Sequence, residues 1–304
     1  MSATSERVPF VEARFLEDLK KGSEEIEAPY DEKTVKDVIN AYGELMYDAA
    51  IQVRGSSRPG VPLLFRVLMT TPADTLDIAI KHGWLHPDDP VVVLATAARS
   101  HFKGPVEQPE FTVDKGCDAM FMYLGGLRSL DEVLAVPGMP DGIKAHRDSF
   151  LGMGLDQIVV VHFQYTEHFV SFFFLAQGPL SRKAFDDLVG LSGAPPPPEA
   201  AYRDVIGVLQ DSPYYLTVVM DHSTGKIVKI ELHLLFPIKL PDDMQIPDIG
   251  EKLTTFWDIP SYEYEDMDIL SYCFGDTSLG DVLALRGYCG GLRSLLRYWN
   301  IIGV

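Results

Sequence analysis

The chain has 304 residues, of which 46% are hydrophobic, and a formal net charge of −18 at pH 7. This length allows one large domain or two modest ones, and the composition is that of a globular protein with a sizeable core. The negative charge argues against binding nucleic acid or an anionic membrane through the bulk surface, so an anionic substrate would need a local cluster of cations.

The three cysteines, Cys117, Cys273 and Cys289, have no metal-ligand spacing and leave an odd thiol, which argues against a disulfide framework and favours a reducing compartment. The N-terminal sequence MSATSERVPFVEARF lacks the apolar core of a signal peptide, and no apolar run is long enough to cross a bilayer. We therefore expect a cytoplasmic protein without membrane contact, and its strong charge favours a monomer.

The N-terminal part predicts two helices and a hairpin. Residues Phe10–Gly22 and Tyr30–Ala50 place apolar side chains at helical spacing, and Asp31 is a suitable N-cap for the second helix. The strands Ala50–Arg54 and Pro62–Met69 then flank a turn rich in glycine and serine.

The next part predicts four helices and one extended segment. The helices cover Pro72–Lys81, Pro90–Ser100, Ser129–Leu134 and Asp141–Gly152. The extended segment covers Phe111–Leu124, and we expect Gly125-Gly126 to end it.

The central part carries the strongest hairpin signals. Two pairs of β-branched and aromatic runs, within Ile158–Gly178 and Tyr214–Phe236, are each interrupted by a short polar turn. Between them, Ser181–Leu191 and Glu199–Leu209 have helical spacing, and the proline run in Ala194–Ala200 is a rigid connector.

The C-terminal part predicts a helix at Asp248–Trp257, strands within Tyr262–Phe274 and Asp281–Tyr288, and a last helix at Leu292–Trp299. Helix, helix and hairpin thus repeat along the whole chain. We expect an α+β fold in which about ten antiparallel strands form a closed barrel inside a ring of α-helices. No linker divides the chain, so residues 1–304 are interpreted as a single domain, and a barrel this wide is expected to hold a ligand cavity.

The order of several short motifs resembles that of aromatic prenyltransferases with the PT-barrel (ABBA) fold, the group that includes the clorobiocin- and naphterpin-type enzymes. The resemblance covers residues 10–300 and rests on motifs that begin at Tyr123 (YLGGLR), Val136 (VPGMP), Gly154 (GLD), Leu188 (LVGLSG), Ser223 (STGKI), Tyr272 (YCFG) and Tyr298 (YWN). It implies an enzyme that joins an allylic diphosphate, of which dimethylallyl diphosphate is the expected one, to a phenolic or indolic acceptor.

The resemblance implies a collar of cations for the diphosphate, and Arg54, Arg66 and Lys229 match its basic positions. Arg66 stands where metal-dependent relatives place an aspartate, so the resemblance implies a metal-independent enzyme without a cofactor. The leaving group carries about three negative charges, which charge-assisted hydrogen bonds stabilise best. The alternative is that these cations point outward or pair with the plentiful carboxylates.

The reaction also needs an apolar, aromatic chamber and a base. The residues expected to line the chamber are Phe121, Tyr123, Phe173, Leu175, Tyr214, Tyr215, Thr217, Leu283 and Leu285. His233 and Glu231 are polar residues on one face of the apolar strand that begins at Ile230, so they are the candidates for acid–base catalysis, with His162 in a similar position. The alternative is that this face lies outside the barrel. The acidic run from Tyr262 to Asp268 is interpreted as a solvated loop and not as a metal site.

Several positions depart from the family pattern. Ala119 and Leu283 replace lysines, Phe173 and Thr217 replace tyrosines, Ser171 replaces an asparagine-like residue, and Leu285 replaces a glutamate proposed as the base in some members. Charge-assisted contacts contribute about 1.5–3 kcal/mol each, so these losses weaken diphosphate binding unless Arg286, Lys226 or Lys115 rebuild the collar. Two alternatives therefore stay open, a cyclase or isomerase acting on a preassembled aromatic or terpenoid intermediate, and a non-catalytic binder of aromatics.

Overall fold

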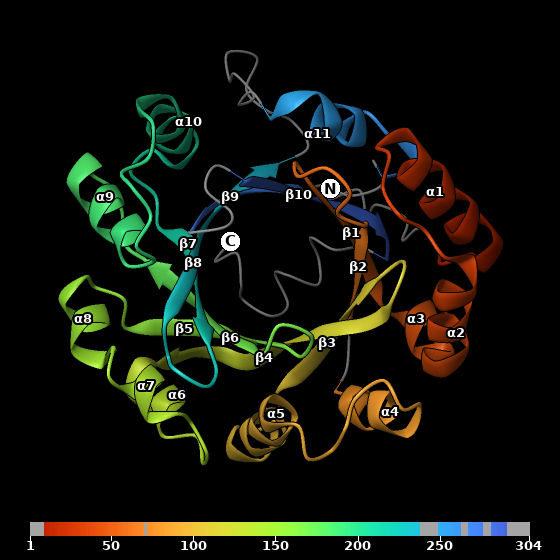
Figure 1. Cartoon of the computed structure of the whole chain (residues 1–304), viewed down its shortest axis with the longest axis horizontal. Helices are drawn as coiled ribbons and strands as arrows, with labels where there is room; N and C mark the ends of the chain where they lie inside the picture. Colours follow the sequence, from red (N-terminus) through yellow and green to blue (C-terminus); the bar gives the residue numbers. More distant parts are fainter. Residues whose placement is uncertain (1–8, 70–71, 238–248, 263–266, 276–280, 291–304) are drawn as a thin grey trace, which may run out of the picture.

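The described part of the computed structural model comprises residues 9–69, 72–237, 249–262, 267–275 and 281–290. Its ten strands form a closed antiparallel barrel, in which each strand pairs with its sequence neighbours and β1 closes the ring by pairing with β10 (Figure 1). The strands are β1 (Ala50–Ser56), β2 (Leu64–Leu68), β3 (Val106–Thr112), β4 (Gly116–Ser129), β5 (Gln157–Gln164), β6 (Phe169–Ala176), β7 (Tyr214–Asp221), β8 (Ile227–Pro237), β9 (Met267–Gly275) and β10 (Asp281–Cys289). The predicted fold class is confirmed.

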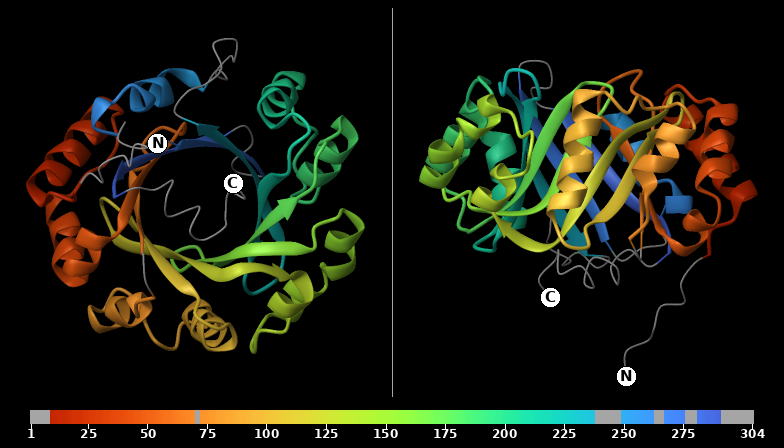
Figure 2. Two further views of the ribbon diagram at one scale, coloured as in Figure 1. Left: turned by 180° about the vertical axis from the view of Figure 1, so that it is seen from behind. Right: turned by 90° about the horizontal axis from the view of Figure 1, so that it is seen from below.

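The helices form a ring outside the barrel, and the strands run obliquely to its axis (Figures 1 and 2). They are α1 (Glu12–Glu25), α2 (Glu32–Tyr42), α3 (Glu44–Asp48), α4 (Thr75–Lys81), α5 (Pro90–His101), α6 (Leu130–Leu134), α7 (Asp141–Lys144), α8 (Arg147–Gly152), α9 (Arg182–Gly190), α10 (Glu199–Leu209) and α11 (Gly250–Trp257), with a 3-10 turn at Pro260–Tyr262. Among the residues described, no helix is both long and apolar enough to span a bilayer.

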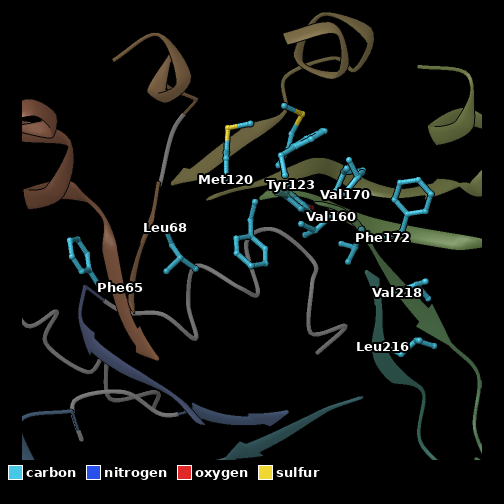
Figure 3. Packing of buried hydrophobic residues seen from close by; sticks show 14 of the residues in the cluster. Phe65, Leu68, Met120, Tyr123, Val160, Val170, Phe172, Leu216 and Val218 are labelled. Carbon is cyan, nitrogen blue, oxygen red and sulfur yellow. The ribbon is translucent and has the colours of Figure 1, made fainter. Parts of the chain in front are cut away.

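The hydrophobic core lies between the sheet and the helices. Successive side chains of a strand point to opposite faces of the sheet, so one set faces the helices and the other faces the barrel interior. Phe65 on β2 and Phe172 on β6 point toward the helices, whereas Leu68 on β2 points into the barrel (Figure 3). Phe65 packs edge to face against Phe15 of α1 with ring centroids 5.3 Å apart, and its centroid lies 5.2 Å from that of Phe111 of β3. Because this outer layer supplies the apolar burial, the interior can remain hollow.

Local sequence explains how α2 begins and ends. The Asp31 carboxylate accepts hydrogen bonds from the backbone N–H groups of Lys33 and Thr34, as expected for an N-cap. The predicted helix over Tyr30–Ala50 is nevertheless wrong as one element, because Gly43 adopts φ +48° and separates α2 from α3. A positive φ of this kind is readily available to glycine and interrupts the helical backbone.

The prediction of a single extended segment at Phe111–Leu124 is also wrong. The chain turns at residues 113–115, and β3 and β4 form a hairpin in which Glu110 lies opposite Ala119. Gly125-Gly126 does not end the strand but lies within an irregularity between Tyr123 and Arg128, after which β4 continues to Ser129. Most of the acidic run after Tyr262 and the helix predicted at Leu292–Trp299 lie outside the described residues.

Candidate active site

The barrel encloses a cavity with about 110 Å³ of room for the centres of water-sized molecules. Side chains from all ten strands line it. The charged residues Arg54, Lys229 and Glu231 lie on the parts of their strands near the hairpin turns, whereas Leu68, Val160, Tyr215 and Ile269 lie farther from those turns. The cavity wall thus combines charged groups with aromatic and aliphatic ones.

Arg54 on β1 and Arg66 on β2 both face the cavity, as the predicted collar requires. They share one carboxylate. Glu110 on β3 places its Oε1 3.1 Å from the Nη2 of Arg54, and its Oε2 accepts a 3.2 Å hydrogen bond from the Nη2 of Arg66. The two arginine side chains are 15% and 13% exposed, whereas that of Glu110 is 1% exposed. The inward orientation and the pairing with a carboxylate, given above as alternatives, therefore occur together.

Lys229 on β8 also faces the cavity, and its Nζ lies 2.5 Å from Oε1 of Glu231. Burial alone would raise the pKa of Glu231, but Lys229 and neighbouring cations outweigh it and hold this pKa at about 2. Burial likewise opposes the charge of Lys229, yet the attraction of Glu231 raises its pKa. Both groups are therefore ionised at neutral pH.

His233 lies two residues farther along β8 and is held from both sides. Its Nε2 is 2.6 Å from the Thr217 hydroxyl of β7, and its Nδ1 is 2.7 Å from the Ser271 hydroxyl of β9. The ring also stacks on Phe173 with centroids 5.1 Å apart and planes 5° apart. Burial lowers the pKa of His233 to about 4, against the opposing attraction of Glu231. At neutral pH the ring is a neutral imidazole that can accept one proton.

Phe121 on β4 lies between two other cavity groups. The guanidinium carbon of Arg66 is 3.3 Å from the centroid of its ring, and His162 on β5 stacks at 3.7 Å. Burial, together with Arg66 and other nearby cations, lowers the pKa of His162 well below its usual value. The Nε2 of His162 is buried without a hydrogen-bond partner. This nitrogen is therefore free to bind a polar group of a ligand.

Five of the residues predicted for the chamber line the cavity directly, namely Phe121, Phe173, Tyr215, Leu283 and Leu285. Thr217 does not line the cavity itself but contacts the lining residue His233 through its hydroxyl. Strand alternation puts Tyr123 and Leu175 on the same inner faces, one step beyond the lining residues, away from the hairpin turns. The prediction for Tyr214 was wrong, because alternation places it with Leu216 and Val218 in the core under the helices.

The replacement collar residues considered from sequence do not all reach the cavity. Arg286 lies on the outer face of β10, where its Nε donates to Asp268 and its Nη1 donates to the backbone oxygen of Ile259. Lys115 is exposed in the β3–β4 turn. Ala119 pairs with Gln164, and Ser171 pairs with His162, so strand pairing places both uncharged residues on the inner side of the sheet. The Ser171 hydroxyl is buried without a partner.

The sequence did not indicate Gln52 and Gln108, which line the cavity, or Glu110, which contacts two of the lining arginines. Residues 106–110 were not predicted as a strand, because Pro109 and two glutamates make the segment look like a loop. The available signal was the spacing of Gln108 and Glu110, which places both on one face of a strand. Among the residues that the structure describes, no three His, Cys, Asp or Glu side chains gather as metal ligands would.

Comparison with known proteins points to one family. The family model described as "Aromatic prenyltransferase Orf2" matches residues 10–300. An aromatic prenyltransferase of Botryotinia fuckeliana is 32% identical, over 99% of this chain and 98% of that protein. A 4-hydroxyphenylpyruvate 3-dimethylallyltransferase of Streptomyces niveus is 27% identical, over 96% of this chain and 89% of that protein.

Solved structures support the fold. The prenyltransferase PriB, in a binary complex described as containing product diphosphate, superposes with a TM-score of 0.57 at 12% identity, covering 91% of this chain and 96% of that one. At this identity the match establishes a shared barrel architecture and no more. It agrees with the closed antiparallel ring described above.

Proposed function

This chain belongs to the Orf2 family of aromatic prenyltransferases, and on that premise we propose that it moves a dimethylallyl group from its diphosphate to a phenolic or indolic acceptor without a metal ion. That the protein is an aromatic prenyltransferase follows from the family and from relatives matched over nearly their whole length. One observation carries the finer proposal. Three cations point into a cavity that is also lined by aromatic and aliphatic side chains.

In this proposal Arg54, Arg66 and Lys229 bind the diphosphate. As the bond between the allylic carbon and the bridging oxygen breaks, negative charge accumulates on the leaving group. Preorganised donors in a site with little water stabilise that charge far more than bulk water would. The guanidinium of Arg66 supplies positive charge from the chain itself, which supports metal-independent ionisation.

The allylic cation would form beside the aromatic residues of the chamber. Phe121 and Phe173 line the cavity, and aromatic rings attract cations electrostatically. The apolar residues around them exclude water, which would otherwise capture the cation as an alcohol. The acceptor ring then attacks the allylic carbon, and one new carbon–carbon bond forms.

We assign His233 as the base that removes the aromatic proton. Its neutral imidazole accepts the proton, and the ionised carboxylate of Glu231 on the same strand stabilises the imidazolium that results. The hydroxyls of Thr217 and Ser271 hold the ring in place, and because they contact both ring nitrogens, the proton reaches the imidazole through one of these hydroxyls. The allylic C–O bond and one aromatic C–H bond break, one carbon–carbon bond forms, the diphosphate leaves with the electron pair of the C–O bond, and His233 keeps the proton. A cyclase or isomerase role is not favoured, because the relatives matched over the whole chain carry transferase names.

Three further proposals concern the domain organisation, the compartment and the oligomeric state of the protein. The described strands all belong to one barrel, which supports a single domain over residues 1–304. Cys117 and Cys273 form no disulfide, which supports a reducing compartment such as the cytoplasm. We further propose a monomer, in line with the net charge of −18.

The decisive experiment incubates the protein with dimethylallyl diphosphate and separate acceptors, namely a dihydroxynaphthalene, 4-hydroxyphenylpyruvate and tryptophan, with EDTA or with Mg²⁺. We expect a product heavier by one dimethylallyl group at similar rates under both conditions. A product that forms only with Mg²⁺ would contradict the metal-independent part alone. No product with any acceptor, together with no binding of inorganic diphosphate by calorimetry, would overturn the proposed site.

A further inference from the structure

The cations proposed for the diphosphate already hold anions that belong to the chain. Arg54 and Arg66 share the carboxylate of Glu110, and Lys229 is paired with Glu231. Glu110 is the more deeply buried of these two carboxylates, and it uses one oxygen for each arginine. An incoming diphosphate therefore meets a site in which a carboxylate occupies the same N–H groups that it needs.

We propose that Glu110 is an internal competitor of the diphosphate, which weakens its binding and speeds the release of inorganic diphosphate after transfer. This inference rests on the proposed function. When the substrate binds, at least one of the two Glu110–arginine contacts must be exchanged for a contact with a phosphate oxygen. When the product leaves, Glu110 takes those N–H groups back.

Glu110 also stabilises the arginine pair when no ligand is bound. Arg54 and Arg66 lie on adjacent strands and repel each other, and burial together with this repulsion lowers the pKa of Arg66 to about 10. Two buried guanidinium groups without an anion would be strongly destabilising. Glu110 neutralises one of the two charges, so the empty collar is stable without a bound ligand.

The same carboxylate opposes the ligand. The Glu110 carboxylate, 3.1–3.2 Å from a nitrogen of each guanidinium group, lies close to any phosphate oxygen that those groups bind, and like charges repel strongly in a poorly solvated cavity. Without Glu110, a polyanion would meet two uncompensated arginines and would bind more tightly. Such a site would also retain its diphosphate product.

A purely structural role for Glu110 predicts the opposite result. If Glu110 only held the arginines in position, its removal would let them move and would weaken binding of any anion. The sign of the change in affinity therefore separates the two roles.

The test measures the binding of inorganic diphosphate to the full-length protein by calorimetry, for the wild type, Glu110→Gln and Glu110→Asp. We expect Glu110→Gln to bind diphosphate on the order of tenfold or more tightly than the wild type, because one opposing charge is gone. Glu110→Asp, which keeps the charge, should stay near the wild-type affinity. Comparison of single-turnover with steady-state rates should then show that Glu110→Gln releases diphosphate more slowly than the wild type.

Glu107→Gln is the matched control. Glu107 is a buried glutamate on the same strand that faces outward, where its carboxylate accepts hydrogen bonds from the Thr75 hydroxyl at 2.6 Å and the backbone N–H of Leu76 at 2.9 Å. Its substitution removes a buried charge of the same kind and should lower the thermal stability without changing diphosphate affinity.

Unchanged or weaker diphosphate binding by Glu110→Gln would overturn the inference while leaving the proposed function intact. If the wild type bound no diphosphate, this result would contradict the proposed diphosphate site itself and not only the role of Glu110. If Glu110→Gln does not fold, the pair Arg54→Gln and Arg54→Gln/Glu110→Gln replaces it, because the double variant removes one charge of each sign. The double variant should then bind diphosphate more tightly than Arg54→Gln, and weaker binding would refute the competition.

Discussion

His233 provides a prediction whose size follows directly from the structure. Its pKa is lowered from the ordinary value of 6.5 to about 4 by burial. A histidine with a depressed pKa in the folded state contributes its full stability above the pKa of the unfolded chain and loses it as the pH falls through the folded pKa. The shift of about 2.5 pKa units corresponds to about 3 kcal/mol, of which about 2.5 kcal/mol is lost by about pH 4.5.

The perturbation is His233→Gln, which removes the titrating ring but keeps a polar side chain between Thr217 and Ser271. The assay is urea unfolding of both proteins at several pH values from about 7.5 to 4.5. We expect the stability of the wild type, relative to that of the variant, to fall by about 2.5 kcal/mol across this range. Other acid-sensitive groups act in both proteins and largely cancel in the difference. A difference that stays constant with pH would refute the assignment of a buried, neutral His233.

The same histidine should appear in the kinetics. If His233 is the base, kcat/KM for the transfer reports its pKa in the free enzyme and should decline only as the pH approaches about 4. The His233→Gln variant should be slower by about 10²–10⁴-fold above that pH, which is the usual contribution of a positioned base. A variant with the rate of the wild type would remove His233 from the mechanism.

Arg66→Gln should raise the Kd for inorganic diphosphate by about 10- to 150-fold, which is the equivalent of one charge-assisted contact. Arg66→Lys keeps the charge and should raise this Kd less, and calorimetry measures both variants. Gly142→Ala should lower the melting temperature, because a Cβ at Gly142 would lie 2.3 Å from the backbone oxygen of Thr224. Gly152→Ala should not lower it, because no atom lies within 4 Å of a Cβ at that position, and differential scanning calorimetry compares the two variants. Leu283→Lys adds a cation to the cavity wall, so the variant should have a lower melting temperature than the wild type without ligand. Inorganic diphosphate should restore part of that stability, and a melting temperature that diphosphate leaves unchanged would contradict the prediction.

The sequence was most informative where strands and turns have strong local preferences. The hairpin of β5 and β6 was predicted with nearly its observed ends, because β-branched and aromatic residues flank a short polar turn. The repetition of helix, helix and hairpin then indicated a closed barrel. Helix breaks such as Gly43 were missed, because a glycine within a helical pattern does not by itself reveal a positive φ.

Prediction from local sequence failed for the strand β3. Its residues include Pro109, Glu107 and Glu110, which are unfavourable in an ordinary strand, and each is accommodated by tertiary structure that the sequence does not display. Glu107 is satisfied from α4 and by Arg99 of α5, and Glu110 is satisfied by two arginines that lie 44 or more positions earlier. A polar segment of this kind is recognised as a strand only when its distant partners are known.

In this barrel the apolar faces of the strands point outward to the helices and the polar faces point inward, which is the reverse of the usual arrangement. On β8, Ile230, Leu232 and Leu234 are fully buried on the outer face, because helices cover that face, and Lys229 and His233 face the cavity. Sequence alternation alone shows that these two sets lie on opposite faces, but it does not show which face is inside. The helices supply the missing information. When each hairpin carries its own amphipathic helices, the apolar face of the strands must meet those helices, and the polar face can only turn toward the interior. For a chain with this repeat, charged residues at alternate strand positions are therefore best interpreted as a lining of the cavity and not as solvent-exposed surface.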